Sequence, residues 1–177
     1  VIERNINSTN PLFPVGLFKD RNFVVATIFM LVFGGMVTLP VVLIPLMLQQ
    51  VQGFPVIGAG MLMLSRGVGS MLSLLLAGTV LNRFDPRVLL AGGFICVAVS
   101  NLYMSTWTED IAVWPIVWTN FVQGCASGIT YVPIIAIGLA TLARNLHTEA
   151  ITFTFLIFNL GSGLGVAIIF ALHTRLL

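Results

Sequence analysis

Residues 60–78 read GMLMLSRGVGSMLSLLLAG, an apolar run in which Arg66 is the one charged residue. The run lies within a longer apolar stretch, residues 56–81, which exceeds the ~20 residues that a helix needs to cross a hydrocarbon core. A charged side chain is ordinary on a soluble helix but costly inside a membrane. The composition of the rest of the chain decides between these two environments.

Composition places the chain in a membrane. Of the 177 residues, 58% are hydrophobic and only 8% are charged, and the mean hydropathy is +1.04. A soluble domain carries about 25% charged residues, because polar surface must cover its core. The net charge of +2 fits basic loops at the cytoplasmic face, and no nucleic-acid partner is indicated.

Five apolar stretches are long enough to span a bilayer: residues 23–48, 56–81, 88–106, 113–142 and 151–172. Short polar breaks separate them, so we expect consecutive spans to be antiparallel neighbours in an all-α polytopic membrane bundle. Barrel strands would instead be about 10 residues long with strict alternation. Residues 1–22 read as a cytoplasmic linker. Since the chain opens on Val1 without a signal-peptide pattern, we expect it to begin within a longer protein.

Loop charges predict the orientation. Six basic residues fall on one side of the predicted bundle: Arg4, Lys19, Arg21, Arg83, Arg87 and Arg144. The other side carries Glu109, Asp110 and the single Arg175. The positive-inside rule therefore places the start of the chain in the cytoplasm, and we expect a bacterial inner membrane.

Glycines cluster in three spans, and in the fourth and fifth spans they have the four-residue spacing of a helix-packing motif. The pairs are Gly67 and Gly69, Gly124 and Gly128, and Gly161 and Gly165. Glycine lets membrane helices approach closely, although this spacing also arises by chance. Pro40, Pro45 and Pro133 lie inside spans and are expected to kink their helices.

A polar stripe runs along the fourth span. Asn120, Gln123, Ser127 and Thr130 fall on one helix face, with Tyr131 at its flank. One interpretation is a set of interhelical hydrogen bonds, each worth about 0.6 kcal/mol. The other is the wall of a water-accessible cavity, which four polar residues in register favour.

Arg66 lies about ten residues, or ~15 Å, into its span, which is near the membrane midplane. An arginine there costs about 2.5–3.5 kcal/mol on insertion scales. A structural ion pair is one explanation, but no Asp or Glu lies within the five spans. The partner is then a backbone carbonyl, water, a substrate or a residue outside this chain, and a functional role is favoured.

Enzymatic chemistry is not indicated. His147 and His173 fall at opposite membrane faces, and neither has a second metal-ligand type at suitable spacing. No nucleophile, zinc-protease or phosphate-loop motif occurs. We therefore expect neither a metal nor another cofactor.

Sequence motifs carry a family resemblance over nearly the whole chain. GTVLNRFDPRVLLAGG resembles the loop between the second and third helices of a major facilitator superfamily half. PLFPVGLFKDRNF, FVQGCASGITYVP and NLGSGLGVAI resemble the carboxy-terminal half of EmrB-type drug:proton antiporters, the fourteen-helix branch. The chain departs from many relatives at Phe158, where they carry arginine, and at Ser65, where proline is frequent.

The resemblance implies that five of the helices of that half are present, and that the last helix and the whole amino-terminal half are absent. It also implies that the first and fourth spans line a central cavity. A cytoplasmic latch would comprise Gly78, Arg83, Asp85 and Arg87. Substrate contact is expected from Thr38, Asn120, Gln123, Thr130 and Tyr131. Arg66 would face the absent half and be neutralised by an acidic side chain there or by an anionic ligand.

The sequence thus predicts part of a secondary active transporter that exports small amphipathic drugs or toxic compounds by alternating access. Its partners would be the substrate, protons, the lipid bilayer and the missing amino-terminal half. The acidic residues that carry the coupling proton in relatives lie in that missing half. A facilitator for a siderophore, lipid or sugar is an alternative within this class, and a non-transporting membrane scaffold or subunit is an alternative outside it.

Overall fold

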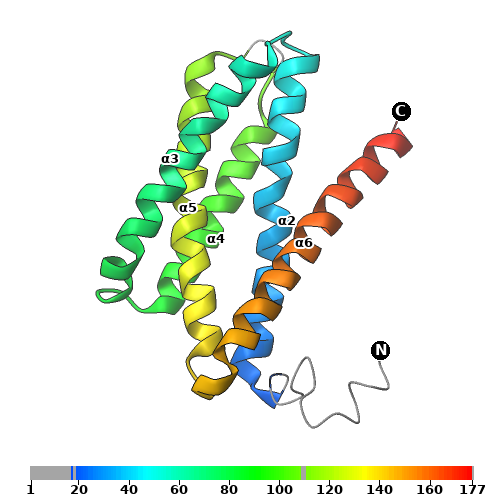
Figure 1. Ribbon diagram of the computed structural model, residues 1–177. Coiled ribbons are helices and arrows are strands. Elements are labelled where there is room, and N and C mark those ends of the chain that lie inside the picture. The colour runs from blue at the N-terminus through cyan, green and yellow to red at the C-terminus, as the bar shows by residue number, and fades with distance from the viewer. Residues whose placement is uncertain (1–16, 18, 109–110, 177) are drawn as a thin grey trace.

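The computed structural model describes residues 17, 19–108 and 111–176, with side chains as far as residue 171. Five long helices run up and down the molecule (Figure 1). They are α2 (Arg21–Gln50), α3 (Val56–Leu81), α4 (Pro86–Ser105), α5 (Val113–Leu139) and α6 (His147–Leu176), the last entered through a short 3₁₀ turn, η2 (Arg144–Leu146). Each long helix is apolar enough to cross a membrane. The predicted all-α membrane bundle is confirmed, while most of the predicted linker, with Glu109 and Asp110, lies outside the described residues.

Two aspartates set where helices begin. Asp20 Oδ1 accepts hydrogen bonds from the backbone N–H groups of Asn22 (2.9 Å) and Phe23 (3.3 Å), which caps α2. Asp85 Oδ1 accepts from the backbone N–H of Arg87 (2.9 Å), and a proline follows at the first position of α4. Because of these caps, α2 and α4 each begin two residues before the apolar stretches predicted from hydropathy alone.

Helix pairing differs from the sequence expectation. Consecutive helices are antiparallel, but the most extensive contacts join α3 to α5 and α2 to α6. Each of these pairs is parallel and skips at least one intervening helix, as Figure 1 shows. α4 packs mainly on α5 and has no extensive contact with α3, its neighbour in sequence. The prediction that consecutive spans are packing neighbours is therefore wrong for α3 and α4.

Glycines explain the α3–α5 pair. A Cβ added at Gly69 would collide with the backbone carbonyl of Phe121, and one at Gly124 would collide with the carbonyl of Arg66. Gly128 lies equally close to the Ser73 hydroxyl. Because these glycines lack side chains, the two backbones come into direct contact.

The α2–α6 pair is built in the same way. A Cβ at Gly161 would collide with the carbonyl of Leu31, and one at Gly165 would lie 2.8 Å from the Cα of Gly35. Gly34 in turn faces the carbonyl of Phe158. Glycines from both helices therefore meet, and those of α2 were not singled out by the sequence analysis.

Two other predicted packing or latch glycines stand apart. A Cβ at Gly67 or at Gly78 would meet nothing within 4 Å among the described residues. Gly67 therefore makes no close contact with any described helix, although Gly69, two residues further on, lies against α5.

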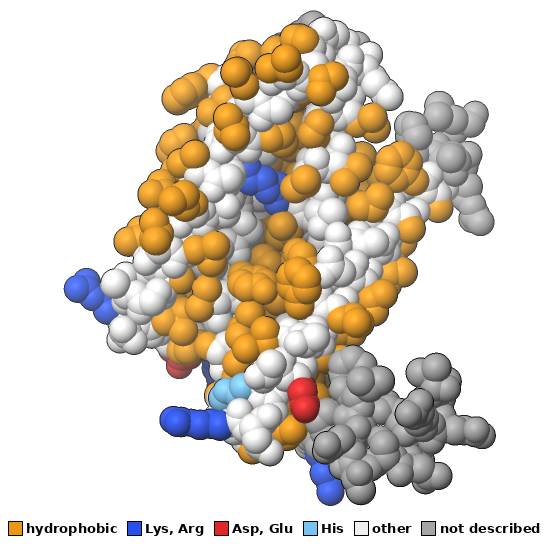
Figure 2. Space-filling model, in the orientation of Figure 1, with side chains coloured by type: hydrophobic (Ala, Val, Ile, Leu, Met, Phe, Trp, Pro, Cys, Tyr) orange, Lys and Arg blue, Asp and Glu red, His pale blue; other side chains and the backbone are white. Residues whose placement is uncertain are grey.

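Apolar clusters fill the bundle at three levels. The central one contains Met30, Phe33, Val97 and Ile134, and joins α2, α4 and α5. A second, around Phe23 and Leu142, closes the end where the chain enters α2. A third contains Ile44, Leu48, Ala59 and Ile116, and closes the opposite end. Large apolar side chains also cover the outer surface, as expected for helices in contact with lipid (Figure 2).

The glycine contacts predict which substitutions break the bundle. In this protein, Gly161→Ala should lower the free energy of unfolding by about 1–3 kcal/mol, the cost of overpacking, because its Cβ meets the Leu31 backbone. Gly163→Ala is the matched control, since its Cβ would meet nothing within 4 Å of the described atoms. Thermal unfolding in detergent measures both, and equal melting temperatures would contradict the packing assignment.

The cap of α2 predicts a local pH dependence. The pKa of Asp20 is lowered from its ordinary 3.8, chiefly by the hydrogen bond from Thr141; desolvation, the next largest effect, raises it, and the N–H groups of Phe23 and Asn22 lower it further. Because the folded pKa lies below the unfolded one, this stabilisation is complete above 3.8 and is lost as pH falls through the folded pKa.

Protection of the Asn22 and Phe23 amides against hydrogen exchange, corrected for intrinsic rates, should therefore fall as the pH drops below about 4. Asp20→Asn keeps a capping oxygen without a titratable group and should show no such fall. The same loss in both proteins would exclude Asp20 as its source.

Candidate functional site

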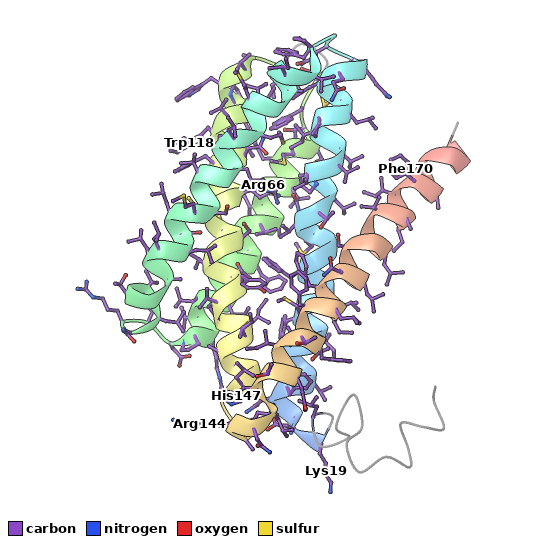
Figure 3. The ribbon with its side chains drawn as sticks, in the orientation of Figure 1. Lys19, Arg66, Trp118, Arg144, His147 and Phe170 are labelled. Atoms are coloured by element: carbon purple, nitrogen blue, oxygen red, sulfur yellow. The ribbon has the colours of Figure 1, made fainter. Side chains whose placement is uncertain are left out.

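One face of the bundle is hollowed between the α3–α5 pair and the α2–α6 pair. Figure 2 shows this hollow with one basic side chain at mid-height, and Figure 3, in the same orientation, labels Arg66 there. The other labelled basic residues, Lys19 and Arg144, lie at one end of the bundle (Figure 3). Arg66 is only 9% exposed, so neighbouring helices enclose most of the residue.

Arg66 finds neutral acceptors on two other helices. Its Nη1 donates to Gln123 Oε1 of α5 at 2.7 Å, and its Nη2 donates to the backbone carbonyl of Val37 in α2 at 2.7 Å. A backbone carbonyl was one of the partners considered from the sequence. Among the described residues, no carboxylate accepts a hydrogen bond from the guanidinium. Its positive charge is therefore not balanced by a negative charge from this part of the chain.

The hydrogen bonds continue from Gln123 to a fourth helix. Gln123 Nε2 donates to Asn101 Oδ1 of α4 at 2.6 Å, and Asn101 Nδ2 donates to the backbone carbonyl of Met36 at 3.1 Å. We call this set, Arg66, Gln123 and Asn101 with the carbonyls of Val37 and Met36, the Arg66 network. It joins α2, α3, α4 and α5, and both ends terminate on adjacent carbonyls of α2.

Close helix approach makes the network possible. Gly124, next to Gln123, rests against the carbonyl of Arg66 itself. The backbones of α3 and α5 therefore touch at the level where the guanidinium meets the amide. A larger residue at position 124 would separate the helices at this level and pull Gln123 away from Arg66.

The rest of the polar stripe lies inside the bundle. Asn120 and Thr130 are 0% exposed and hydrogen-bond to carbonyls one turn earlier in α5, those of Ile116 (2.8 Å) and Ala126 (2.6 Å). Thr130 also faces Gly93 of α4. Asn120 Oδ1 is buried and accepts no hydrogen bond among the described residues. These side chains lie between helices, whereas Ser127 and Tyr131 reach an open surface.

That surface is a groove of about 280 Å³ formed by α2, α3, α5 and α6. We call it the aromatic groove, and its lining residues are Phe33, Val37, Ser70, Leu74, Ser127, Gly128, Tyr131 and Phe158. Phe158 is central to it, with ring centroids 6.1 Å from Phe33 and 6.5 Å, edge-on, from Tyr131. Because Val37 lines the groove and also accepts from Arg66, the network borders the groove at one end.

The predicted substrate-contact residues thus occupy different environments. Tyr131 lines the aromatic groove, while Asn120, Gln123 and Thr130 are enclosed between helices. Thr38 Oγ1 accepts a hydrogen bond from Ser162 Oγ at 2.8 Å and so joins α2 to α6.

The predicted latch residues lie at the basic end of the bundle. Arg83, Asp85 and Arg87 are exposed around the turn between α3 and α4, and Asp85 uses one carboxylate oxygen to cap α4. Beside this turn, Arg87 borders a groove of about 400 Å³ between α2 and α4, whose other basic residue is Arg21. Among the described residues, no cluster of His, Cys, Asp or Glu side chains could hold a metal ion.

Comparison with known proteins identifies the family. The sequence profile described as Major Facilitator Superfamily matches residues 5–175. The chain belongs to the major facilitator superfamily.

Curated relatives of the chain are named for drug export or for resistance to drugs or fatty acids. The chain is 28% identical to the probable multidrug resistance protein EmrY of Escherichia coli over 95% of its own length and 33% of the relative's. It is 26% identical to the multidrug export protein EmrB of the same organism, over 96% and 33%. With the fatty acid resistance protein FarB of Neisseria gonorrhoeae it shares 27% identity, over 93% and 32%. The chain therefore spans about a third of the length of these superfamily members.

Asn101 is the residue of the network that sequence reasoning missed. It lies near the end of α4, beside Ser100, and carried no partner signal in the sequence. A polar amide inside an apolar span was the available clue, because such groups need a hydrogen-bond partner in a membrane.

The network predicts an unequal effect of two buried substitutions in α5. Gln123→Leu removes the side-chain acceptor of Arg66, and should lower the free energy of unfolding by about 1.5–3 kcal/mol, the range for hydrogen bonds to charged groups. Thr130→Val is the matched control, because Thr130 is equally buried and loses only a bond within its own helix. Thermal unfolding of the protein in detergent would separate the two, and a larger effect of Thr130→Val would contradict the assignment.

Proposed function

We propose that this chain forms most of the carboxy-terminal half of a secondary active transporter. The transporter exports small amphipathic drugs or toxic compounds, coupled to protons, by alternating access. The observation that carries the proposal is the aromatic groove beside the buried charge of Arg66, on the hollowed face between two helix pairs. Membership of the superfamily supplies the transport class.

The groove suits amphipathic molecules. It offers three aromatic rings, two serine hydroxyls and the tyrosine hydroxyl, and no acidic side chain lines it. Ligand pockets in proteins are typically about 300–1,000 Å³, so a groove of 280 Å³ in one half supplies a part of such a site. The names of EmrB, a multidrug export protein, and FarB, a fatty acid resistance protein, support apolar or amphipathic substrates for this chain as well.

Orientation and latch belong to the same proposal. Arg21, Arg83, Arg87 and Arg144 lie at one end of the bundle, which the positive-inside rule assigns to the cytoplasm. There, Gly78, Arg83, Asp85 and Arg87 would form contacts that hold the inward end closed in one state. The free carboxylate oxygen of Asp85 leaves an acceptor for such a contact.

Proton carriers would have to lie elsewhere in the transporter. The described acidic residues are Asp20, Asp85 and Glu149, and each lies at or beside the amino-terminal end of a helix. None is at the depth of Arg66 or the aromatic groove. The proposal therefore assigns substrate contact to this chain and proton binding to a part of the transporter outside it.

Cysteine accessibility in the complete transporter tests the proposal. With Cys96 and Cys125 replaced, Ser127→Cys and Tyr131→Cys should react with a water-soluble thiol reagent in one conformation, and an exported dye such as ethidium should slow the reaction. Asn120→Cys is the buried control, because Asn120 is 0% exposed. Water reaches the groove in a transporter, so the first two positions should label and the control should not.

Two results would overturn the proposal. Complete protection of Ser127→Cys and Tyr131→Cys under all conditions would indicate dry helix contacts, as in a membrane scaffold. Labelling without any accumulation or efflux of amphipathic compounds in vesicles would exclude export. Efflux that persists without a proton gradient would remove the proton coupling alone.

A further inference from the structure

Pro40 leaves a gap in the backbone hydrogen bonds of α2. The helix continues from Arg21 to Gln50 through this residue, which is buried. Proline has no backbone N–H, so the carbonyl four residues earlier, that of Met36, loses its intrahelical donor. The proline ring also crowds this turn, so the neighbouring carbonyl of Val37 belongs to the same weakened segment.

Side chains from other helices bond both of these carbonyls. Asn101 of α4 donates to Met36 O, and Arg66 of α3 donates to Val37 O. Gln123 of α5 joins the two donors. In membrane helices, groups freed by proline are commonly satisfied by neighbouring helices, and here a connected network does so.

The other helix prolines lack such partners. Pro45 in α2 and Pro133 in α5 free the carbonyls of Val41 and Ile129 in the same way. Among the described residues, no side chain of another helix donates to either carbonyl. The network is therefore specific to the Pro40 turn.

The Pro40 turn also separates two differently packed parts of α2. Before it, Gly34 and Gly35 lie directly against α6. After it, Ile44 and Leu48 pack with the first turns of α3 and α5. A proline between two segments fixed to different partners is a position at which a helix bends as its partners move.

We propose that Arg66 and Asn101 are positioning residues that hold the Pro40 turn in one conformation of the transport cycle. The network breaks when α2 bends at this turn and forms again when the first conformation returns. This inference rests on the proposed function, because it assigns the bend to alternating access. Arg66 acts here through the α2 backbone, and the role requires no carboxylate partner.

A double-mutant cycle in the complete transporter tests this coupling. Pro40→Ala restores a backbone N–H at position 40, which can donate to Met36 O and make Asn101 dispensable. Asn101→Leu alone should change the labelling rate of Ser127→Cys, which reports the conformation, by about 5-fold or more, the lower end of typical conformational coupling. In the Pro40→Ala background, the same substitution should have an effect of less than about 2-fold, because the coupling is gone.

Pro45→Ala is the matched control. It also restores a backbone donor in α2, but it restores one to a carbonyl that the network does not reach. The effects of Asn101→Leu and Pro45→Ala should therefore be additive. The maximal transport rate should fall in Asn101→Leu while KM changes little. In the Pro40→Ala background, Asn101→Leu should have almost no effect on the maximal transport rate.

The outcomes separate the two proposals. If Asn101→Leu has additive effects in both proline backgrounds and the unmodified protein transports normally, the assignment of the network to the Pro40 turn is overturned. The proposed transport function is then left intact. Absence of any transport in the unmodified protein would overturn the proposed function instead. If Asn101→Leu fails to fold, Asn101→Ala is the second variant. If Pro40→Ala does not suppress the effect of Asn101→Ala on the labelling rate, the assignment of the network to the Pro40 turn is also overturned.

Discussion

The guanidinium of Arg66 needs hydrogen-bond acceptors inside a bundle in which no described carboxylate reaches it, and much of the structure follows from how these acceptors are supplied. Lipid cannot hydrogen-bond to an arginine, so every acceptor must come from the protein or from trapped water. Gln123 supplies one, but only because Gly124 lets α5 touch the backbone of α3 at this level. Val37 supplies the other, at the turn that Pro40 weakens.

The acceptors of Arg66 lie in a bundle that is built from two parallel helix pairs, each packed through glycines. α3 with α5 and α2 with α6 each form a tight unit, and the hollowed face lies between them. Within each unit the backbones are in direct contact, so bulk cannot be added there without separating the helices. Between the units, the contacts are made by the apolar clusters, by aromatic rings and by the long side chain of Arg66. The closest backbone contacts thus lie within the pairs, and the aromatic groove lies between them.

Hydropathy and charge were sufficient to predict five spanning helices, because membrane insertion requires long apolar runs whatever the tertiary structure. Family motifs predicted the superfamily. The partners of Arg66 could not be predicted, since Val37 and Gln123 are far from it in sequence. Hydropathy does not show which helices pack together, or which of their residues lie at the same level. The same limit applies to Asn101, whose amide is one of several polar groups in the spans until the fold places it beside Met36. Gly34 and Gly35 are adjacent in sequence and do not show the four-residue spacing of Gly124 and Gly128 or of Gly161 and Gly165.

The composition of the Arg66 network determines how its hydrogen bonds respond to pH. Its members are two side-chain amides, two backbone carbonyls and a guanidinium, which keeps its charge at any pH that a cell meets. None of these groups gains or loses a proton as the two sides of an energised membrane differ in acidity. The hydrogen bonds that the network makes to α2 are therefore insensitive to such a difference in pH. If the proposed cycle is driven by protons, movement of the helices and not protonation must break these hydrogen bonds, and the groups that bind protons must lie outside the network.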